Sequence, residues 1–168
     1  RHLKIYCDFI YYNMIHYVFD LDDTLILHKN QIYYDWIHED KELTYCLEKC
    51  KGEKYIYTNG TLDHAITIIE KMNIRDQFIK VYSRDTIKYM KPRLESFQDV
   101  HNDISDKDRQ PKVIFFFDDR LENLQTASQM GWYTIWIHNN YSLQHMYNYV
   151  NLAFPNIKDA LRFLEKRI

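Results

Sequence analysis

Two aspartates separated by a single residue offer the clearest chemistry in the sequence. Asp20 and Asp22 follow directly after the apolar run Ile15–Phe19, which predicts a buried strand. Residues two apart in an extended or tightly turning segment project to the same side. Because adjacent carboxylates repel each other, such a pair favours a bound cation or a proton held by one member. The pair suits a nucleophile, a proton donor and a divalent metal in one place, with a solvated acidic turn as the alternative.

The elements that must hold this pair alternate between strands and helices. Strands are predicted at residues 15–19, 54–57, 78–82, 113–117 and 132–137. Amphipathic helices are predicted around residues 43–50, 62–72, 94–100, 121–128 and 157–164. Gly52 is expected to cap the first helix, and Pro92 to lie in the first turn of the third. Residues 1–14 remain either an edge strand or a packing arm.

This alternation predicts an α/β fold with a central parallel sheet of about five strands, covered by helices on both faces. Ligands of such sheets bind beyond the carboxyl ends of the strands. The polar residues at those ends are Asp20, Asp22, Thr58, Asn59, Ser83, Arg84, Asp118, Asp119, His138 and Asn139. Lys91 follows soon after the third strand. Together these carboxylates, small donors and a lysine would form a metal-assisted anion site.

The composition is that of an ordinary globular protein and excludes few function classes. With 168 residues, 46% of them hydrophobic, and a net charge of −2, we expect one domain and a monomer without a general attraction to nucleic acid. No apolar run reaches membrane-spanning length, so no membrane partner is expected. The cysteines Cys7, Cys46 and Cys50 fit a reducing compartment and a cytoplasmic location. Because the chain begins at Arg1 rather than Met, the sequence does not decide whether a leader or tag has been removed.

Four short motifs follow one another between residues 15 and 138. They are Phe19-Asp20-Leu21-Asp22-Asp23-Thr24-Leu25, Ile56-Tyr57-Thr58-Asn59-Gly60, Lys91-Pro92, and Phe117-Asp118-Asp119 with Arg120 and Asn123. Each is weak alone, but the ordered set resembles the haloacid dehalogenase-type phosphohydrolase superfamily. Residues 116–132 are most similar to its nucleotidase and phosphoglycolate phosphatase branches. The resemblance implies a doubly wound, Rossmann-like three-layer sandwich with strand order 3-2-1-4-5, which places Asp20 and Asp118 side by side.

The resemblance also implies roles for the acidic residues. Asp20 would attack phosphorus to form an aspartyl-phosphate, and Asp22 would protonate the leaving oxygen and later accept a proton from water. Mg²⁺ would be held by the Asp20 carboxylate, the Asp22 backbone carbonyl and Asp118. Asp119 would orient Lys91 or a metal-bound water.

Three further residues would bind the phosphate. Thr58 and the backbone of Asn59 would donate hydrogen bonds to it, although capping of the following helix is the alternative for both. Lys91 would offset its charge. By contrast, the histidines His28, His38 and His64 are expected to be surface or packed residues, and the acids Asp23 and Glu122 to be solvated.

Residues 35–51 already look like the crossover helix between the first two strands, which leaves little room for a lid domain. The chain therefore resembles a member of the superfamily without a cap, whose open site admits nucleotides, phosphoproteins or nucleic-acid ends. The basic residues Arg84, Lys88, Lys91 and Arg93 either steer an anionic substrate or form an ordinary solvated face.

These observations favour a Mg²⁺-dependent phosphomonoester hydrolase. One alternative is a catalytically silent binding module with the same fold, which would not need Asp20, Asp22, Lys91 and Asp118 together. Another is a phosphoryl-accepting receiver domain, in which the accepting aspartate follows a later strand than the paired acids. The identity of the substrate is not fixed by the sequence.

Overall fold

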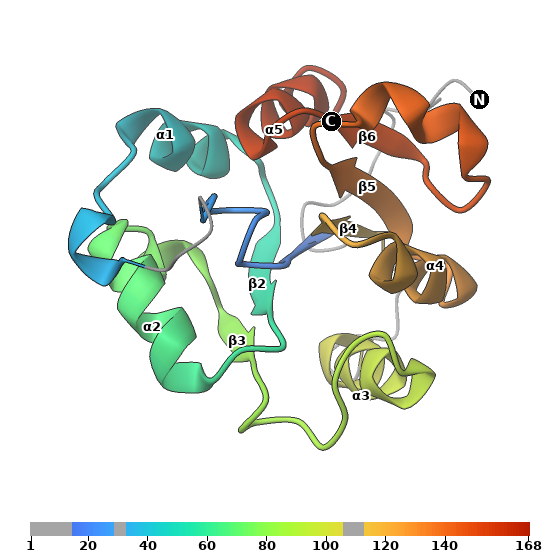
Figure 1. Ribbon diagram of the computed structural model, residues 1–168, viewed down its shortest axis with the longest axis horizontal. Coiled ribbons are helices and arrows are strands. Elements are labelled where there is room, and N and C mark those ends of the chain that lie inside the picture. Colours follow the sequence, from blue (N-terminus) through green and yellow to red (C-terminus); the bar gives the residue numbers. More distant parts are fainter. Residues whose placement is uncertain (1–14, 29–32, 106–112) are drawn as a thin grey trace.

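A parallel sheet of six strands forms the centre of the computed structural model, which describes residues 15–28, 33–105 and 113–168 (Figure 1). The strands are β1 (Ile15–Phe19), β2 (Glu53–Tyr57), β3 (Lys80–Tyr82), β4 (Val113–Asp118), β5 (Tyr133–Ile137) and β6 (Leu152–Phe154). Their order is β3-β2-β1-β4-β5-β6, and every neighbouring pair is parallel. The α/β fold class and the order of the first five strands are confirmed. The arm or edge strand expected at 1–14 lies outside the described residues.

Helices cover both faces of this sheet. They are α1 (Lys41–Lys49), α2 (Leu62–Lys71), α3 (Leu94–Ser105), α4 (Leu121–Gln129) and α5 (Ile157–Glu165). Buried residues of α1, α2 and α5 join one apolar cluster, and those of α3 and α4 join a second cluster (Figure 1). The predicted three-layer arrangement is therefore present, with three helices on one face and two on the other.

The central strands are apolar at successive positions because both of their faces are buried. On β1 and β4, Phe19 and Phe117 belong to the cluster under α1, α2 and α5, and their rings stack with centroids 4.6 Å apart. Val18 and Phe116 belong to the cluster under α3 and α4. A continuous apolar run is typical of a strand in the middle of a parallel sheet.

The sixth strand extends the sheet beyond the five that the sequence predicted. In β6, Leu152, Ala153 and Phe154 are all half-buried and pair with β5 at the edge of the sheet. A run of three residues is too short to show a period of two, and its neighbours carry no strand signal. Edge strands of this length are therefore hard to predict from sequence.

Two predictions about helix ends were wrong. The C-cap of α1 is Cys50 rather than Gly52, whose φ is +142°. A Cβ at Gly52 would lie 2.5 Å from the carbonyl oxygen of Ile15, so glycine is needed there for close approach of the backbone to β1. Pro92 precedes α3, which begins at Leu94, and lies in the turn that positions Lys91.

In the described residues, the connections between strands consist of covering helices, short 3₁₀ helices and loops. Between β1 and β2 these residues form a short 3₁₀ helix, Tyr34–Trp36, and α1. Between β2 and β4 they form α2, a second short 3₁₀ helix, β3 and α3. No inserted lid domain is present in the described residues. Within the same residues, no helix is both long and apolar enough to cross a membrane.

Candidate active site

A cavity of about 300 Å³ lies at the carboxyl ends of β1, β2 and β4. It is lined by Asp20, Asp22, Asp23, Thr58, Asn59, Gly60, Lys91, Asp119, Arg120 and Asn123. The register of β1 and β4 pairs Phe19 with Phe117, so Asp20 and Asp118 leave the sheet side by side. The strand ends therefore bring together the polar residues that the motifs marked.

A tight turn follows β1 and places Thr24 over the first aspartate. The carbonyl oxygen of Leu21 accepts hydrogen bonds from the backbone N–H groups of Leu25 (3.0 Å) and Ile26 (3.2 Å). Asp23 supports this turn in the left-handed region, with φ +60°. The Thr24 hydroxyl lies 2.9 Å from Asp20 Oδ2, and Asp20 and Asp22 both line the cavity.

Lys91 lies at the bottom of this cavity and forms an acid–lysine cluster with Asp20 and Asp118. Its Nζ donates to Asp20 Oδ1 (3.0 Å), Asp118 Oδ2 (2.9 Å) and the carbonyl oxygen of Tyr57 (2.7 Å). The side chain is 1% exposed. Burial alone would lower the pKa of Lys91, but the charges and hydrogen bonds of Asp118 and Asp20 outweigh it and raise the pKa. Lys91 is therefore a fixed cation.

The backbone of Lys91 is held by Asn59. Asn59 Oδ1 accepts from the N–H of Lys91, and Asn59 Nδ2 donates to its carbonyl oxygen, both at 2.9 Å. Thr58 Oγ1 accepts from the N–H of Gly60 at 3.0 Å. The N-cap of α2 is Thr61, so the capping alternative for Thr58 and Asn59 was wrong. The Asn59 side chain instead links the end of β2 to the lysine.

The two neighbouring acids after β4 have different surroundings. Asp118 is fully buried, and its Oδ2 accepts from both Lys91 Nζ and Asn123 Nδ2. Asp119 is half-buried and lines the cavity. Burial, and then the charge of Asp118, raise the pKa of Asp119 to about 6. The hydrogen bonds of Lys91 Nζ go to Asp20, Asp118 and Tyr57, so Asp119 does not orient this lysine. The other expected role of Asp119, orienting a metal-bound water, stays a prediction.

Asp119 is also fixed through its backbone. The indole N–H of Trp136, on β5, donates to the carbonyl oxygen of Asp119 at 3.0 Å. Trp136 is buried, and its ring stacks on His138 with centroids 5.0 Å apart. His138 therefore packs against the site from outside rather than entering it.

The negative charge of these carboxylates exceeds what Lys91 can balance. Oxygens of Asp20, Asp118 and Asp119 all lie within 4.8 Å of one another. Burial, followed by the charge of Asp118, raises the pKa of Asp20 well above its usual range, although Lys91 opposes this rise. A hard divalent cation with oxygen ligands fits this donor set and its charge.

Asp22 lies at the rim of the cavity and contacts two histidines, with which it forms an Asp–His cluster. His28 Nε2 lies 2.6 Å from Asp22 Oδ1, and His64 Nε2 lies 2.8 Å from the same oxygen. The two histidine side chains are 10% and 13% exposed, and the Asp22 side chain is 32% exposed. The expectation that His28 and His64 are ordinary surface or packed residues missed these contacts.

Comparisons with known proteins relate this geometry to solved structures. No family model matches the sequence, and no curated protein matches it. In contrast, L-2-haloacid dehalogenase from Xanthobacter autotrophicus matches with a TM-score of 0.60 at 14% identity, covering 80% of this chain and 64% of the dehalogenase. The core domain of a protein named as a phosphoglycolate phosphatase, from Streptococcus pneumoniae, matches with a TM-score of 0.61 at 19% identity, covering 91% and 96% of the two chains.

A third match is the hydrolase YfnB from Bacillus subtilis, with a TM-score of 0.60 at 15% identity, covering 74% of this chain and 55% of YfnB. The chain thus spans less than two thirds of the length of the dehalogenase and of YfnB. These similarities settle the architecture.

The chain has the haloacid dehalogenase-type fold.

The basic residues near the site do not form the basic stretch that the sequence predicted. Lys91 is buried, so it does not belong to an exposed basic stretch with its neighbours. Arg84 Nε donates to the carbonyl oxygen of Asn59 at 3.1 Å, and Arg93 pairs with Glu95. Arg120 lines the cavity and is exposed, and its Nε pairs with Glu122 Oε1 at 2.9 Å. Arg120 directly follows Asp118 and Asp119 in the sequence, and this position could have predicted that it lies at the cavity.

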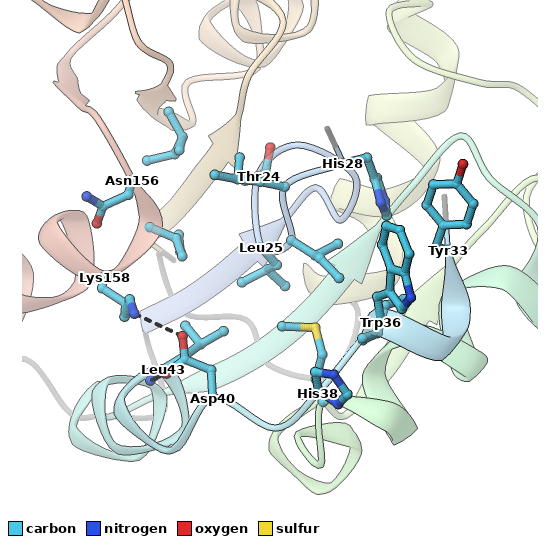
Figure 2. Close-up of a pocket in the computed structure, with 16 residues that line it drawn as sticks. Thr24, Leu25, His28, Tyr33, Trp36, His38, Asp40, Leu43, Asn156 and Lys158 are labelled. Atoms are coloured by element: carbon cyan, nitrogen blue, oxygen red, sulfur yellow. Dashed lines mark hydrogen bonds and ion pairs between the residues drawn. The ribbon is translucent and has the colours of Figure 1, made fainter. Parts of the chain in front are cut away.

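A second, larger cavity of about 530 Å³ adjoins the turn after β1 in this haloacid dehalogenase-type fold. Figure 2 shows Trp36 and His38 on one side of it and Lys158 on the other. Thr24 and His28 also line it, so it begins next to residues that contact Asp20 and Asp22. His38 is exposed at its edge, as the sequence predicted for this residue.

Proposed function

We propose that the protein is a hydrolase, and specifically a Mg²⁺-dependent phosphomonoester hydrolase that works through an aspartyl-phosphate on Asp20. The observation that carries this proposal is the placement of Asp20. One carboxylate oxygen is bonded to Lys91 and the other to Thr24, at the bottom of a cavity that Asp22 also lines. A nucleophile fixed at both oxygens next to an acid–base group is the arrangement that two-step ester hydrolysis needs.

In the first step, an oxygen of Asp20 attacks phosphorus and the bond from phosphorus to the ester oxygen breaks. Protonated Asp22 donates its proton to that leaving oxygen. In the second step, Asp22 accepts a proton from water, whose oxygen attacks phosphorus. The bond from Asp20 to phosphorus then breaks, and inorganic phosphate and the free carboxylate are released.

The cation of this proposal is Mg²⁺, and we assign its carboxylate ligands to Asp20 and Asp119, with the backbone carbonyl of Asp22. The assignment of Asp119 replaces that of Asp118, whose Oδ2 already accepts from Lys91 and Asn123 and whose side chain is fully buried. When bound, Mg²⁺ would neutralise the carboxylates and polarise the phosphoryl oxygens. YfnB, which shares the fold, was solved bound to magnesium.

Phosphate recognition would come from Thr58 and the backbone of Asn59, with Lys91 below them. The Thr58 oxygen accepts from Gly60, and no acceptor for its own proton is found among the described residues, so this proton is free to donate into the cavity. The exposed guanidinium of Arg120, which pairs with Glu122, lies at the rim and would reach a bound phosphate only by leaving that partner. Without a lid in the described residues, the site is open to nucleotides, phosphoproteins or nucleic-acid ends.

Three alternatives are weaker. A receiver domain has the flavodoxin-like strand order 2-1-3-4-5, which differs from the order observed here. Dehalogenation, the reaction named for one fold relative, needs no proton donor, because a halide leaves as an anion. Asp22 at the cavity therefore favours an ester whose leaving oxygen must be protonated. A catalytically silent binding module would have no need for the hydrogen bonds from Lys91 and Thr24 that hold both carboxylate oxygens of Asp20.

The test is turnover of a panel that contains a small aryl phosphate, a nucleoside monophosphate, a phosphopeptide and a 3′-phosphorylated oligonucleotide. Each would be assayed with Mg²⁺, with Ca²⁺ and after exhaustive chelation. We expect turnover with Mg²⁺, little with Ca²⁺, whose looser geometry misaligns the attack, and none in chelator. Full activity in chelator would contradict the metal assignment. The absence of turnover on the whole panel would favour the binding module.

A further inference from the structure

The Asp–His cluster at the rim of the cavity has the composition of a metal site of a different kind. Nitrogen atoms of His28 and His64 and an oxygen of Asp22 all lie within 4.8 Å of one another. Both Nε2 atoms point at the same oxygen, Asp22 Oδ1, at 2.6 and 2.8 Å. Ligands that bind one zinc ion at about 2 Å lie about 3 Å apart, so little movement separates this arrangement from a ligand set.

The nitrogen and oxygen atoms of these three side chains determine which metal ion the cluster prefers. Two imidazoles and one carboxylate suit Zn²⁺ and similar borderline ions, whereas Mg²⁺ prefers oxygen ligands alone. The proposed Mg²⁺ site offers the carboxylate oxygens of Asp20 and Asp119, so the two neighbouring sites differ in chemistry. Three protein ligands would leave a fourth position of a tetrahedral ion open toward the cavity.

The surroundings of His64 support this role. Tyr34 Oη lies 2.6 Å from His64 Nδ1, the ring nitrogen that faces away from Asp22. The hydroxyl can donate to a bare Nδ1 or accept from a protonated one. His64 can therefore present Nε2 either with a proton, as a donor to Asp22, or without one, as a ligand. Such an outer partner is typical of histidines that bind metals.

Two further observations support a metal site: the position of His28 and the access of solvent to Asp22. The backbone N–H of His28 donates to Asp23 Oδ1 at 2.9 Å, which holds this residue against the turn after β1. The Asp22 side chain is 32% exposed, so an ion from solvent can reach the three donors. His28 and His64 come from different segments, the turn after β1 and the first turn of α2.

We propose that Asp22, His28 and His64 form a second metal site, selective for Zn²⁺ over Mg²⁺, and that its occupation inhibits the enzyme. A carboxylate bound to Zn²⁺ cannot carry the proton that the leaving oxygen needs, so the ion removes Asp22 from its part in the reaction. The inhibitory effect rests on the proposed function, whereas binding of the ion does not.

Binding is tested directly on the whole chain, with Mg²⁺ in excess to occupy the oxygen site. Zn²⁺ affinity is measured by competition with a chromogenic chelator, and Co²⁺ serves as a spectroscopic probe of nitrogen ligation. We expect one equivalent bound to the wild type, and binding at least tenfold weaker in His28→Ala and in His64→Ala. Tyr34→Phe, which removes an outer partner, should weaken binding by about tenfold. His145→Ala, which removes an exposed histidine elsewhere, is the matched control and should change nothing.

His64→Gln serves as a second variant if His64→Ala does not fold, as judged by circular dichroism. Equal Zn²⁺ affinity in the wild type and in both cluster variants would overturn the proposal, as would equal weakening by His145→Ala. If the histidines only orient Asp22 by hydrogen bonds, their removal would lower turnover without changing Zn²⁺ affinity, which would also overturn it.

Turnover at fixed Mg²⁺ and rising Zn²⁺ separates the two proposals. We expect inhibition of the wild type, and at least tenfold more Zn²⁺ to be needed for the same inhibition of His28→Ala and His64→Ala. Undiminished turnover of the wild type at rising Zn²⁺, with no second ion bound, would overturn this inference and leave the phosphatase standing. Zn²⁺ bound at Asp22 in a protein that hydrolyses no ester would support the site and contradict the proposed function.

Discussion

The acid–lysine cluster and the Asp–His cluster lie at the bottom and at the rim of the same cavity, which Asp20, Lys91 and Asp22 line, but they are built in different ways. Asp20, Lys91 and Asp118 are buried and fixed by strand ends, and each has charged partners on other elements. Asp22, His28 and His64 lie at the rim, on a turn and on the first turn of a helix. Burial makes the first cluster rigid and strongly electrostatic, whereas the Asp22 side chain of the second cluster is 32% exposed and can exchange partners. A fixed nucleophile and a movable proton carrier are what a two-step reaction requires.

The largest expected effect comes from replacing the proposed nucleophile. Asp20→Asn should lower kcat by about 10⁴-fold or more, because the amide cannot form the covalent intermediate. Lys91 keeps Asp118 and the Tyr57 carbonyl as partners, so the fold should remain. Asp99→Asn, on the exposed side of α3, is the matched control. Activity of Asp20→Asn near the wild-type level would remove Asp20 from this role.

Asp22→Asn should have a smaller effect that depends on the leaving group. Loss of a general acid costs about 10²–10⁴-fold in rate, and the cost falls when the leaving oxygen is already stable as an anion. We therefore expect a large loss with an alkyl phosphate and a small loss with a nitrophenyl phosphate. The ratio of the two rates in the variant and in the wild type is the measurement. Equal losses on both substrates would mean that Asp22 does not carry the proton.

Lys91→Met tests how much the stability of the folded protein depends on the cation of the buried cluster. Removal of the lysine leaves Asp20 and Asp118 buried without their main partner, so we expect the free energy of unfolding to fall by about 3–5 kcal/mol. Urea denaturation of the metal-free protein measures this. Lys88→Met, at an exposed position three residues earlier, is the control and should change stability by less than about 0.5 kcal/mol. If both variants lost less than about 0.5 kcal/mol of unfolding free energy, the charge of Lys91 would not be needed to stabilise the buried carboxylates.

Asp119 gives a pH dependence whose sign follows from its surroundings. Its pKa is raised to about 6 in the folded protein, against about 4 in an unfolded chain. The folded state therefore holds a proton that the unfolded state has lost, and the free energy of unfolding falls as the pH rises from about 4 to about 6. Asp119→Asn lacks this decline, so its stability relative to the wild type should be greater at pH 7 than at pH 4.5.

The measurement for Asp119 is the urea midpoint of both metal-free proteins at the two pH values. Addition of Mg²⁺ at pH 7 should raise the midpoint of the wild type more than that of Asp119→Asn, because a bound cation stabilises the folded state. A constant difference between the two proteins across this pH range would contradict the burial of the Asp119 carboxyl.

The smallest expected effect concerns substrate size. If no lid covers the cavity, catalytic efficiency for a small aryl phosphate and for a phosphopeptide or a 3′-phosphorylated oligonucleotide should agree within about tenfold. Small substrates should also bind weakly, because no closing lid adds binding energy. A steep preference for one small metabolite, with macromolecules excluded, would mean that another segment closes the site.

The difference between the clusters also explains which parts could be predicted from sequence. Asp20, Lys91 and Asp118 follow strands or lie near them in a pattern with a known order, and a parallel sheet brings its strand ends together. The division of roles between Asp118 and Asp119 depends on which side chain turns into the core, and adjacent identical residues carry no signal for this. His28 lies in a turn, and contacts made by turns depend on the three-dimensional path of the chain.

The bond between Trp136 and the site gives the molecule an internal optical probe. The indole N–H donates to the carbonyl oxygen of Asp119, and the ring is 3% exposed, so its emission comes from a dry and constant environment. A change of charge at Asp119 acts on an indole one hydrogen bond away, without any added label. Trp36 is 72% exposed and can be quenched selectively by a soluble quencher, which leaves the emission of the buried Trp132 as a background to that of Trp136. Ion arrival can therefore be followed in real time by fluorescence, in the unmodified protein and before any substrate is known.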